Sequence, residues 1–356
     1  EQLAAELKPA DAINIQFTSG TTGMPKGATL DHTNILNNAY YAGQSMHFSK
    51  DDILCIPVPM YHCFGMVLGT LVCVAHGATM VLPCEVFDPE PVLQAIQDEN
   101  CTALHCVPTM FIAELDLPHF REFDVSSLRT GIIAGSTCPV ELMKRLISDM
   151  ELTEIVIGYG QTECSPLNCM TAIEDTFDQR VTTVGRPHTN WEVKIIREDG
   201  SVAEYGETGE VCSRGYGVML GYWDDDEKTA DTIDAEGWLH SGDLGEMNAD
   251  GYVKITGRIK DMIIRGGENV YPREIEEFLY THPNIQEVQV FGLPDEKYGE
   301  QVAAWVQLKQ GADLTEEQIR EHCAGQITHF KIPKYIKMVS EFPMTVTGKM
   351  QKFVMR

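Results

Sequence analysis

The chain has 356 residues, of which 43% are hydrophobic and 22% are charged. A chain of this length and apolar content can bury a large core, and its length is typical of about two or three domains. Its formal net charge of −26 at pH 7 argues against sequence-independent binding of nucleic acid, because such binding needs lysines and arginines to neutralise phosphates. An anionic nucleotide would therefore have to meet a local basic patch.

Cysteine usage and apolar patterning indicate the compartment. The chain has eleven cysteines but no Cys-x-x-Cys pair, and several lie within apolar runs, which predicts buried free thiols in a reducing, cytoplasmic setting. The N-terminus lacks a basic start followed by an apolar core, so we expect no signal peptide. The most apolar stretch, 65–82, is interrupted by polar residues and glycine, and we expect a buried helix, a turn and a strand rather than a transmembrane segment.

An apolar alternating run at 13–17 predicts a strand that leads into a loop of hydroxyls and glycines at 18–27, Thr-Ser-Gly-Thr-Thr-Gly-Met-Pro-Lys-Gly. Small residues let backbone N–H groups close around an anion, the hydroxyls donate hydrogen bonds, and Lys26 adds a positive charge. The candidate phosphate-binding residues are Thr18, Ser19, Gly20, Thr21, Thr22, Gly23 and Lys26. The lysine precedes the last glycine and no serine or threonine follows, which disfavours a P-loop NTPase. The alternative is an ordinary flexible turn.

Helices and strands alternate from residue 31 to residue 157. A helix is expected to begin near the possible caps Asp31 and Thr33, and a strand, a glycine loop and a helix in succession are typical of an anion site. Further strands are predicted at 53–58, 78–82, 102–106, 128–133 and 154–157, and further helices at 61–75, 89–98, 108–115 and 139–149. This alternation predicts a mostly parallel α/β sheet with ligands at the carboxyl ends of its strands.

Three loops after these strands are candidate site loops, at 59–62, 134–136 and 158–163. Beyond residue 181 the pattern changes to short strands at 191–197 and 209–213 and a hairpin at 245–256. A charged break at 257–261 precedes a further pattern, with helices at 272–280 and 315–325 and strands at 285–291, 301–308 and 335–339. We therefore expect an α/β part (1–180) and a β-rich subdomain (181–259) in one large domain, followed by a small α+β domain (260–356).

The last 26 residues carry six cationic side chains and a single acid, Glu341. Such an asymmetry in an acidic protein favours a surface that faces a polyphosphate, and the alternative is an ordinary solvated face.

These features together resemble the adenylate-forming (AMP-binding) superfamily, which includes acyl-CoA synthetases, luciferases and peptide-synthetase adenylation domains. The likeness runs from about Ile13 to Lys349 through five separated signatures in the family's order. It implies that 1–259 is the AMP-binding core and that 260–356 is a mobile lid. It also implies a long region before the phosphate loop that completes the sheet and the acyl pocket, and we expect this chain, with 17 residues before Thr18, to lack it.

The resemblance implies roles for the loop that ends at Glu163. In the family this Glu binds Mg²⁺, the preceding Thr162 contacts phosphate, and Tyr159 stacks on adenine. A carboxylate suits Mg²⁺ beside a triphosphate, although a solvated loop acid is the alternative. The nucleotide-binding positions implied in the loops after the strands also include Gly135, Ser136 and Gly160.

Other signatures imply the remaining nucleotide and acyl contacts. Asp243 and Arg258 resemble the family's ribose clamp, in which a carboxylate offers two acceptor oxygens to a diol; alone, Ser-Gly-Asp would be a turn. His62 matches the aromatic position of the acyl pocket, although a lone histidine beside an apolar helix is otherwise typical of a core. Lys349 resembles the adenylation lysine, which balances charge on the carboxylate and the α-phosphate.

The lid signatures imply the second half-reaction. Gly266 and Gly267 resemble the segment that borders the pantetheine tunnel, where a missing side chain lets a thin chain pass close to the backbone. Lys260 matches the hinge about which the lid turns.

The sequence thus predicts a ligase that activates a carboxylic acid, most similar to fatty acyl members, with ATP, Mg²⁺ and CoA. Two alternatives stay open within the class, an aryl-acid CoA ligase and a stand-alone adenylation domain. A nucleotide-binding fragment without turnover is the third. We expect small-molecule partners and no nucleic acid, with a homodimer left open.

Overall fold

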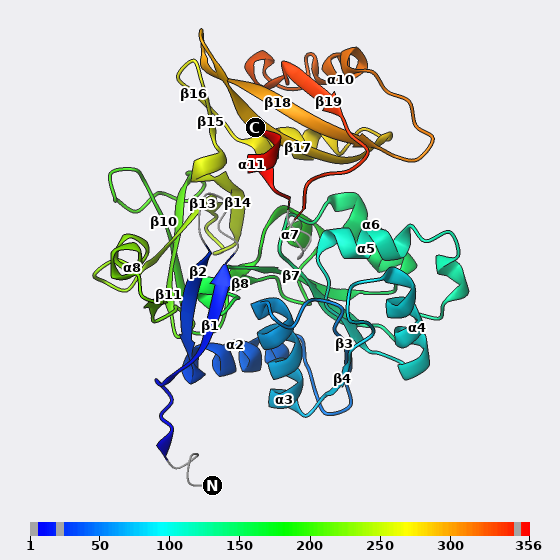
Figure 1. The fold of residues 1–356 in the computed structure, drawn as a ribbon, viewed down its shortest axis with the longest axis vertical. Helices are drawn as coiled ribbons and strands as arrows, with labels where there is room; N and C mark the ends of the chain where they lie inside the picture. The colour runs from blue at the N-terminus through cyan, green and yellow to red at the C-terminus, as the bar shows by residue number, and fades with distance from the viewer. Residues whose placement is uncertain (1–5, 19–24, 345–349) are drawn as a thin grey trace. The chain divides into compact units, whose positions relative to one another are not determined.

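The computed structural model describes residues 6–18, 25–344 and 350–356, which Figure 1 shows as a ribbon. The chain divides into two compact units. Unit 1 comprises Glu1–Glu207, Val211–Ser241 and Met247–Lys254, and unit 2 comprises Thr208–Glu210, Gly242–Glu246 and Ile255–Arg356. The boundary predicted at residues 259 and 260 lies near the start of the continuous part of unit 2.

Unit 1 begins with an antiparallel hairpin followed by a helix. The elements are β1 (Ala12–Thr18), β2 (Lys26–Asp31), β12 (Gly221–Tyr222) and α2 (His32–Ser45). The three strands form one sheet in the order β1-β2-β12. Asp31 caps α2 by accepting from the backbone N–H of Asn34, whose side chain accepts from the N–H of Asp31 in return. The predicted cap is confirmed. The predicted order of strand, loop and helix is wrong, because β2 intervenes between the loop and the helix.

The largest sheet has seven strands in the order β4-β3-β5-β6-β7-β8-β9. The strands are β3 (Ile53–Cys55), β4 (Thr79–Val81), β5 (Ala103–Leu104), β6 (Thr130–Ile133), β7 (Glu154–Tyr159), β8 (Cys169–Met170) and β9 (Arg186–Pro187). Pairing is parallel from β4 to β7 and antiparallel at β8 and β9. Ile132 and Ile133 point to opposite faces and both are buried, as in a sheet covered on both sides. The predicted parallel α/β sheet is confirmed.

Two groups of helices accompany this sheet. The helices of unit 1 after α2 are η1 (Phe64–Leu71), α3 (Val72–His76), α4 (Pro89–Glu99), α5 (Pro108–Leu115), η2 (Phe120–Glu122), α6 (Val140–Asp149), η3 (Thr162–Cys164), α7 (Phe177–Thr182) and α8 (Asp226–Thr232). Helix α5 contacts α4 and α6, whereas α2 contacts η1 and α3 (Figure 1). Helix α4 begins where its sequence predicts, because Asp88 accepts from the Glu90 N–H and a proline occupies the first position.

The apolar stretch 65–82 is divided as expected. It forms the π-helix η1, then α3, a turn at Gly77 with φ of +71°, and β4. No helix in the described part of the chain is long and apolar enough to cross a membrane. None of the eleven cysteines, all of which lie in the described residues, is in a disulfide, and all but Cys84 are buried, which confirms the predicted buried thiols.

A partly buried group of one arginine and two acids ties together the starts of the parallel strands. Asp52, just before β3, accepts from the Arg129 guanidinium at 2.8 Å, and Arg129 also donates to Glu154 at 2.8 Å. Burial alone would raise the pKa of Asp52, but hydrogen bonds from Thr102 and Ser49 and the charge of Arg129 lower it below its usual value. These charged contacts hold the amino ends of the parallel strands together. The predicted site loops follow the carboxyl ends.

A second, four-stranded sheet follows, in the order β10-β11-β13-β14. Its strands are β10 (Trp191–Ile196), β11 (Gly209–Gly215), β13 (Leu239–Met247) and β14 (Val253–Arg258). The predicted hairpin turn is confirmed: Asn248 donates its N–H to the Tyr252 carbonyl at 3.0 Å, and Gly251 takes a φ of +82°. This sheet is the predicted β-rich subdomain.

Unit 2 contains a five-stranded sheet with the order β16-β15-β18-β17 and β19 paired to β18. Its elements are η4 (Ile259–Asp261), β15 (Ile263–Arg265), β16 (Glu268–Val270), α9 (Pro272–Leu279), β17 (Ile285–Asp295), β18 (Gly299–Leu308), α10 (Glu316–Cys323), η5 (His329–Lys331), β19 (Tyr335–Met338) and α11 (Lys352–Met355). Val288 and Val290 pack with α9 and α10 in one core, whereas Phe291 packs with Met355 of α11 in another. The alternation along β17 thus places helices on both faces.

Most of the cations near the C-terminus have acidic partners within unit 2. The ion pairs are Lys331–Glu274, Lys334–Asp295, Lys352–Glu276 and Arg356–Asp261. Lys337 lies over the Trp305 ring. These contacts offset much of the positive charge that the sequence places near the C-terminus. They weigh against a free basic surface formed by these five side chains.

We expect a buried acid to make the stability of unit 1 depend on pH. Glu114 in α5 is fully buried, and burial raises its pKa to about 8, while the Cys106 thiol donates to it at 3.5 Å. Because this pKa exceeds that of the unfolded chain, near 4.5, the stabilisation is complete below pH 4.5 and is lost as the pH rises towards 8. Glu114→Gln should therefore reduce the decline of the free energy of unfolding with rising pH, which in the wild type is on the order of a few kcal/mol.

Urea unfolding between pH 5.5 and 8.5 measures this effect. The exposed residue Glu99 provides the matched control, Glu99→Gln, which should keep the slope of the wild type. An equal slope in Glu114→Gln and the wild type would contradict the assignment.

Candidate nucleotide-binding site

The ends of the phosphate loop are held by the first hairpin. Thr18 and Lys26 are paired across β1 and β2, and the Thr18 hydroxyl donates to the Lys26 carbonyl at 3.4 Å. The predicted positions Ser19, Gly20, Thr21, Thr22 and Gly23 lie outside the described residues. The hairpin therefore sets where the loop begins and ends, and it directs the Lys26 side chain.

Glu163 lies in the short helix η3, just after β7. Its neighbour Thr162 is also buried. The chain reaches this position through Gly160, which has a φ of +157°, and a Cβ there would lie 2.1 Å from the Pro166 carbonyl oxygen. Only glycine fits at this position, so the loop that follows Tyr159 is shaped by a backbone contact as well as by any ligand.

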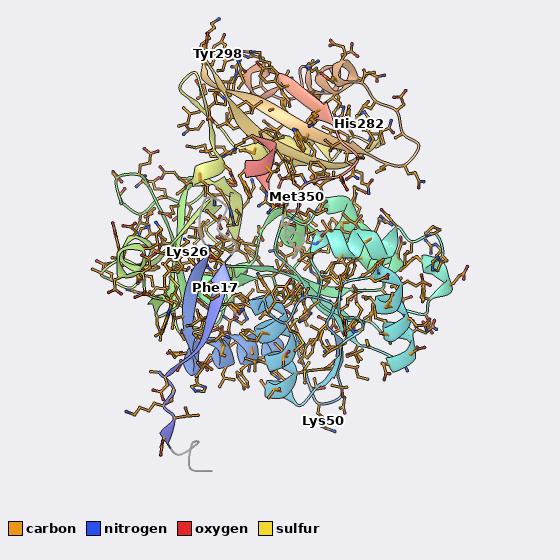
Figure 2. All side chains as sticks on the ribbon, in the orientation of Figure 1. Phe17, Lys26, Lys50, His282, Tyr298 and Met350 are labelled. Carbon is orange, nitrogen blue, oxygen red and sulfur yellow. The ribbon has the colours of Figure 1, made fainter. Side chains whose placement is uncertain are left out.

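The structure joins Lys26 and Glu163 through a third residue, Tyr222. The Lys26 ammonium donates to the Tyr222 hydroxyl at 3.2 Å, and that hydroxyl donates to a Glu163 carboxylate oxygen at 2.7 Å. The ammonium also lies 4.5 Å from the centre of the Tyr222 ring. Figure 2 labels Lys26 close to the ends of the hairpin strands. A cation and a buried carboxylate thus face one region, as binding of a metal-bound phosphate requires.

Burial and the neighbouring Glu163 charge both raise the pKa of the Tyr222 phenol well above its ordinary value. The hydroxyl therefore stays protonated and donates to Glu163 throughout the physiological range. Sequence reasoning missed Tyr222, because β12 has only two residues and a strand so short carries no periodic signal.

Lys26 and Glu163 belong to different sheets. Lys26 lies in the sheet β1-β2-β12, and Glu163 follows β7 of the seven-stranded sheet. Strand β12 bridges the two parts, because it pairs with β2 while the Met219 N–H donates to the Glu163 carbonyl at 3.0 Å.

Three other predicted positions follow parallel strands of the large sheet. Gly135 and Ser136 are exposed just after β6, and Gly135 takes a φ of +90°. His62 follows β3 and is half-buried, and its Nδ1 accepts from the Phe64 N–H at 3.1 Å, at the start of η1. In a neutral ring this contact leaves the proton on Nε2.

Unit 2 brings together the two residues of the predicted ribose clamp. The Arg258 Nε lies 2.9 Å from an Asp243 oxygen, and Asp243 is buried while Arg258 is about half exposed. The acid is on β13, and the arginine ends β14. A buried carboxylate held by a guanidinium is oriented to accept from a diol.

The remaining lid positions are local features of unit 2. Gly266 and Gly267 form the two-residue turn between β15 and β16, with φ of +62° and +88°; such a turn requires glycine on conformational grounds. Lys260 lies in η4. Lys349 lies outside the described residues.

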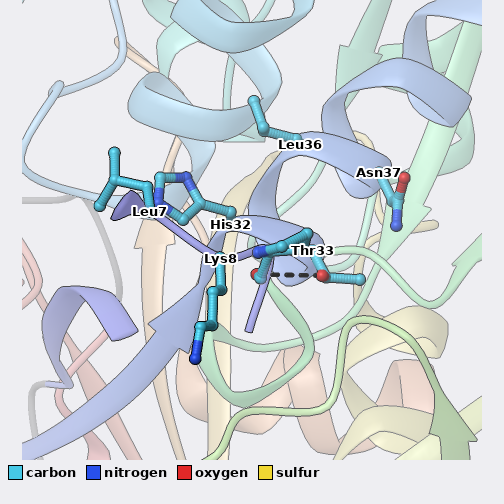
Figure 3. A pocket seen from close by; sticks show the side chains of 7 residues that line it. Leu7, Lys8, His32, Thr33, Leu36 and Asn37 are labelled. Carbon is cyan, nitrogen blue, oxygen red and sulfur yellow. Dashed lines mark hydrogen bonds between the residues drawn. The ribbon is translucent and has the colours of Figure 1, made fainter. Parts of the chain in front are cut away.

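A surface hollow lies away from these side chains. Figure 3 shows its lining at the start of α2, where the Thr33 hydroxyl donates to the Pro9 carbonyl at 3.1 Å. The lining residues are Leu7, Lys8, Pro9, His32, Thr33, Leu36 and Asn37. None of the predicted site residues is among them.

A parallel α/β sheet, a phosphate-loop lysine linked to a buried acid, and a separate unit with a paired acid and arginine define a class of nucleotide-binding α/β proteins. Comparison with known families identifies the family within this class. Residues 1–223 match the AMP-binding enzyme family, and residues 274–349 match the AMP-binding enzyme C-terminal domain. The chain therefore belongs to the AMP-binding enzyme family.

Similar proteins carry related names. The chain is 51% identical to the putative acyl-CoA synthetase YngI of Bacillus subtilis, covering 100% of this chain and 65% of that protein. It is 47% identical to the mitochondrial medium-chain acyl-CoA ligase ACSF2 of Bos taurus, covering 97% of this chain and 57% of that protein. The crystal structure of ATP-bound MatB from Rhodopseudomonas palustris superposes with a TM-score of 0.90 at 31% identity, covering 98% of this chain and 68% of that one. The chain thus spans roughly three fifths of the length of the curated relatives.

We predict that Asp243→Asn weakens ATP binding about tenfold, because the loss of a charge-assisted hydrogen bond to the ribose costs about 1.5–3 kcal/mol. With 2′,3′-dideoxy-ATP the same substitution should change affinity less than twofold, since the hydroxyls that Asp243 would bind are missing. Isothermal titration calorimetry with both nucleotides measures this. An equal loss with both nucleotides would assign Asp243 a purely structural role.

Proposed function

We propose that this chain carries the ATP-dependent activation of a carboxylic acid, with a medium-chain fatty acid as the substrate class, and transfer of the acyl group to CoA. The acid's carboxylate attacks the α-phosphorus of ATP, a P–O bond forms, and pyrophosphate leaves. The CoA thiol then attacks the acyl carbonyl of acyl-AMP, and AMP leaves. The observation that carries the proposal is the buried Glu163 carboxylate linked through Tyr222 to the phosphate-loop lysine.

The residues of unit 1 supply charge and orientation rather than a nucleophile. Lys26 would balance the negative charge of the phosphates, and the hydroxyls and backbone N–H groups of the loop from Thr18 would hold their oxygens. Tyr159 would stack on adenine, and Gly135, Ser136 and Thr162 would border the nucleotide. His62, fixed by the Phe64 N–H, would line the acyl pocket.

Glu163 fits a magnesium ion. Its carboxylate is buried, and one of its oxygens accepts a hydrogen bond from Tyr222. Carboxylate oxygens together with phosphate oxygens are the usual ligands of Mg²⁺ beside a triphosphate. When bound, Mg²⁺ would neutralise charge on the leaving pyrophosphate, and Glu163 would hold it there.

Unit 2 would serve both half-reactions. Asp243 and Arg258 would bind the ribose, and Lys349 would stabilise the charge that develops during adenylation. A turn of the unit about Lys260 would then present Gly266 and Gly267 to the pantetheine of CoA. The name of the relative at 47% identity supports a medium-chain acid.

One alternative within the same family is a nucleotide-binding chain without turnover. The chain spans 57–65% of the length of the two named curated relatives, so the activity of the whole relatives is a proposal for this chain. Binding of ATP without release of pyrophosphate would distinguish this alternative from the complete enzyme.

Pyrophosphate release with Mg-ATP and a panel of short, medium, long and aromatic carboxylic acids, each with and without CoA, tests the proposal. We expect release that depends on a medium-chain acid, and a thioester only when CoA is present. Lys349→Ala should reduce release at least 100-fold, because it removes a cation that acts where charge develops. The exposed residue Lys309 provides the control, since Lys309→Ala should retain full activity. Bound ATP without release for every acid would reject the ligase in favour of the alternative.

A further inference from the structure

The strongest feature that the proposed function leaves unexplained is the phenol between Lys26 and Glu163. In the described part of the chain these two opposite charges are joined only through the Tyr222 hydroxyl, and no direct ion pair connects them. Such a pair would be the expected contact between an ammonium and a buried carboxylate so close together, because both gain from it in a low-dielectric setting.

The backbone around Tyr222 is fixed from both sides. Tyr222 is paired with Ala28 across β12 and β2, and the Trp223 N–H donates to the Gly27 carbonyl at 2.7 Å. On the other side the Tyr222 N–H donates to the Thr229 hydroxyl of α8 at 2.8 Å. The backbone at Tyr222 therefore cannot shift without breaking strand pairing, and the residue is buried, with 6% of its surface exposed.

Gly221 makes this close packing possible. It takes a φ of +151°, and a Cβ there would lie 2.9 Å from the Thr229 side chain. Only glycine lets α8 approach β12 so closely. This packing helps to hold the backbone of Tyr222 in the place where its hydroxyl contacts both Lys26 and Glu163.

We propose that Tyr222 is a positioning residue that keeps Lys26 and Glu163 apart, so that each stays available to one component of a metal–triphosphate. The proposal rests on the proposed function, since it assigns the phosphate to Lys26 and the metal to Glu163. Without the hydroxyl, the Lys26 ammonium would move onto the Glu163 carboxylate, and Mg-ATP would have to break that pair in order to bind. The hydroxyl acts through both neighbours and touches no reacting atom.

Equilibrium binding of ATP, with and without Mg²⁺, tests the proposal without requiring turnover. Tyr222→Phe keeps the ring and its packing, and we expect it to weaken Mg-ATP about tenfold and to raise the Mg²⁺ concentration for half-maximal ATP binding by a similar factor. Tyr216→Phe is the matched control, because Tyr216 is a partly buried tyrosine of the same unit that packs on Trp191. It should change neither quantity by more than twofold.

A double-substitution cycle separates spacing from general destabilisation. In a Lys26→Gln background there is no ammonium at position 26 to pair with Glu163. Tyr222→Phe should then weaken the affinity for Mg-ATP less than twofold. An unchanged Mg²⁺ requirement in Tyr222→Phe, or the same loss in both backgrounds, would overturn the proposal. Failure of the proposed function is distinguishable, because it would be seen as a wild type that binds Mg-ATP yet releases no pyrophosphate with any acid.

Discussion

The pairing of β12 with β2 is the contact on which the candidate phosphate site depends. It brings Tyr222 to Lys26 across a sequence separation of 196 residues, and the adjoining Met219 N–H ties the same segment to Glu163. The entropy of closing so long a loop is offset by the buried cores of the sheets on either side. Lys26 and Glu163 are thereby positioned by two different sheets, and the Tyr222 hydroxyl contacts both of them.

Three buried acids of this protein differ in the partners that hold them. Asp52 has Arg129, Thr102 and Ser49, and Asp243 has Arg258. Glu114 has only the Cys106 thiol for one oxygen, and its other oxygen has no partner among the described residues. The partners of Asp52 lower its pKa and keep it charged, whereas burial raises the pKa of Glu114 and favours its protonated form.

Features encoded by neighbouring residues could be predicted from the sequence. The Asp31 cap, helix α5 (Pro108–Leu115) and the parallel order from β4 to β7 follow from capping chemistry, a proline at a first position, and apolar runs between turn residues. The strand β2 was missed because Lys26–Asp31 is short and carries little alternation. The sequence showed that position 267 is a glycine. The structure adds a conformational reason for glycine there, because Gly267 has a positive φ in the turn between β15 and β16.

By itself the sequence determined the family and the identity of the acid and the arginine that pair in unit 2, because these depend on residue types at short, fixed spacings. Only the tertiary structure decided which sheet holds each group, that four described C-terminal cations pair with acids of their own unit, and that Tyr222 lies between Lys26 and Glu163. The physical reason is that strand pairing between distant segments depends on the packing of whole layers, which no local pattern records.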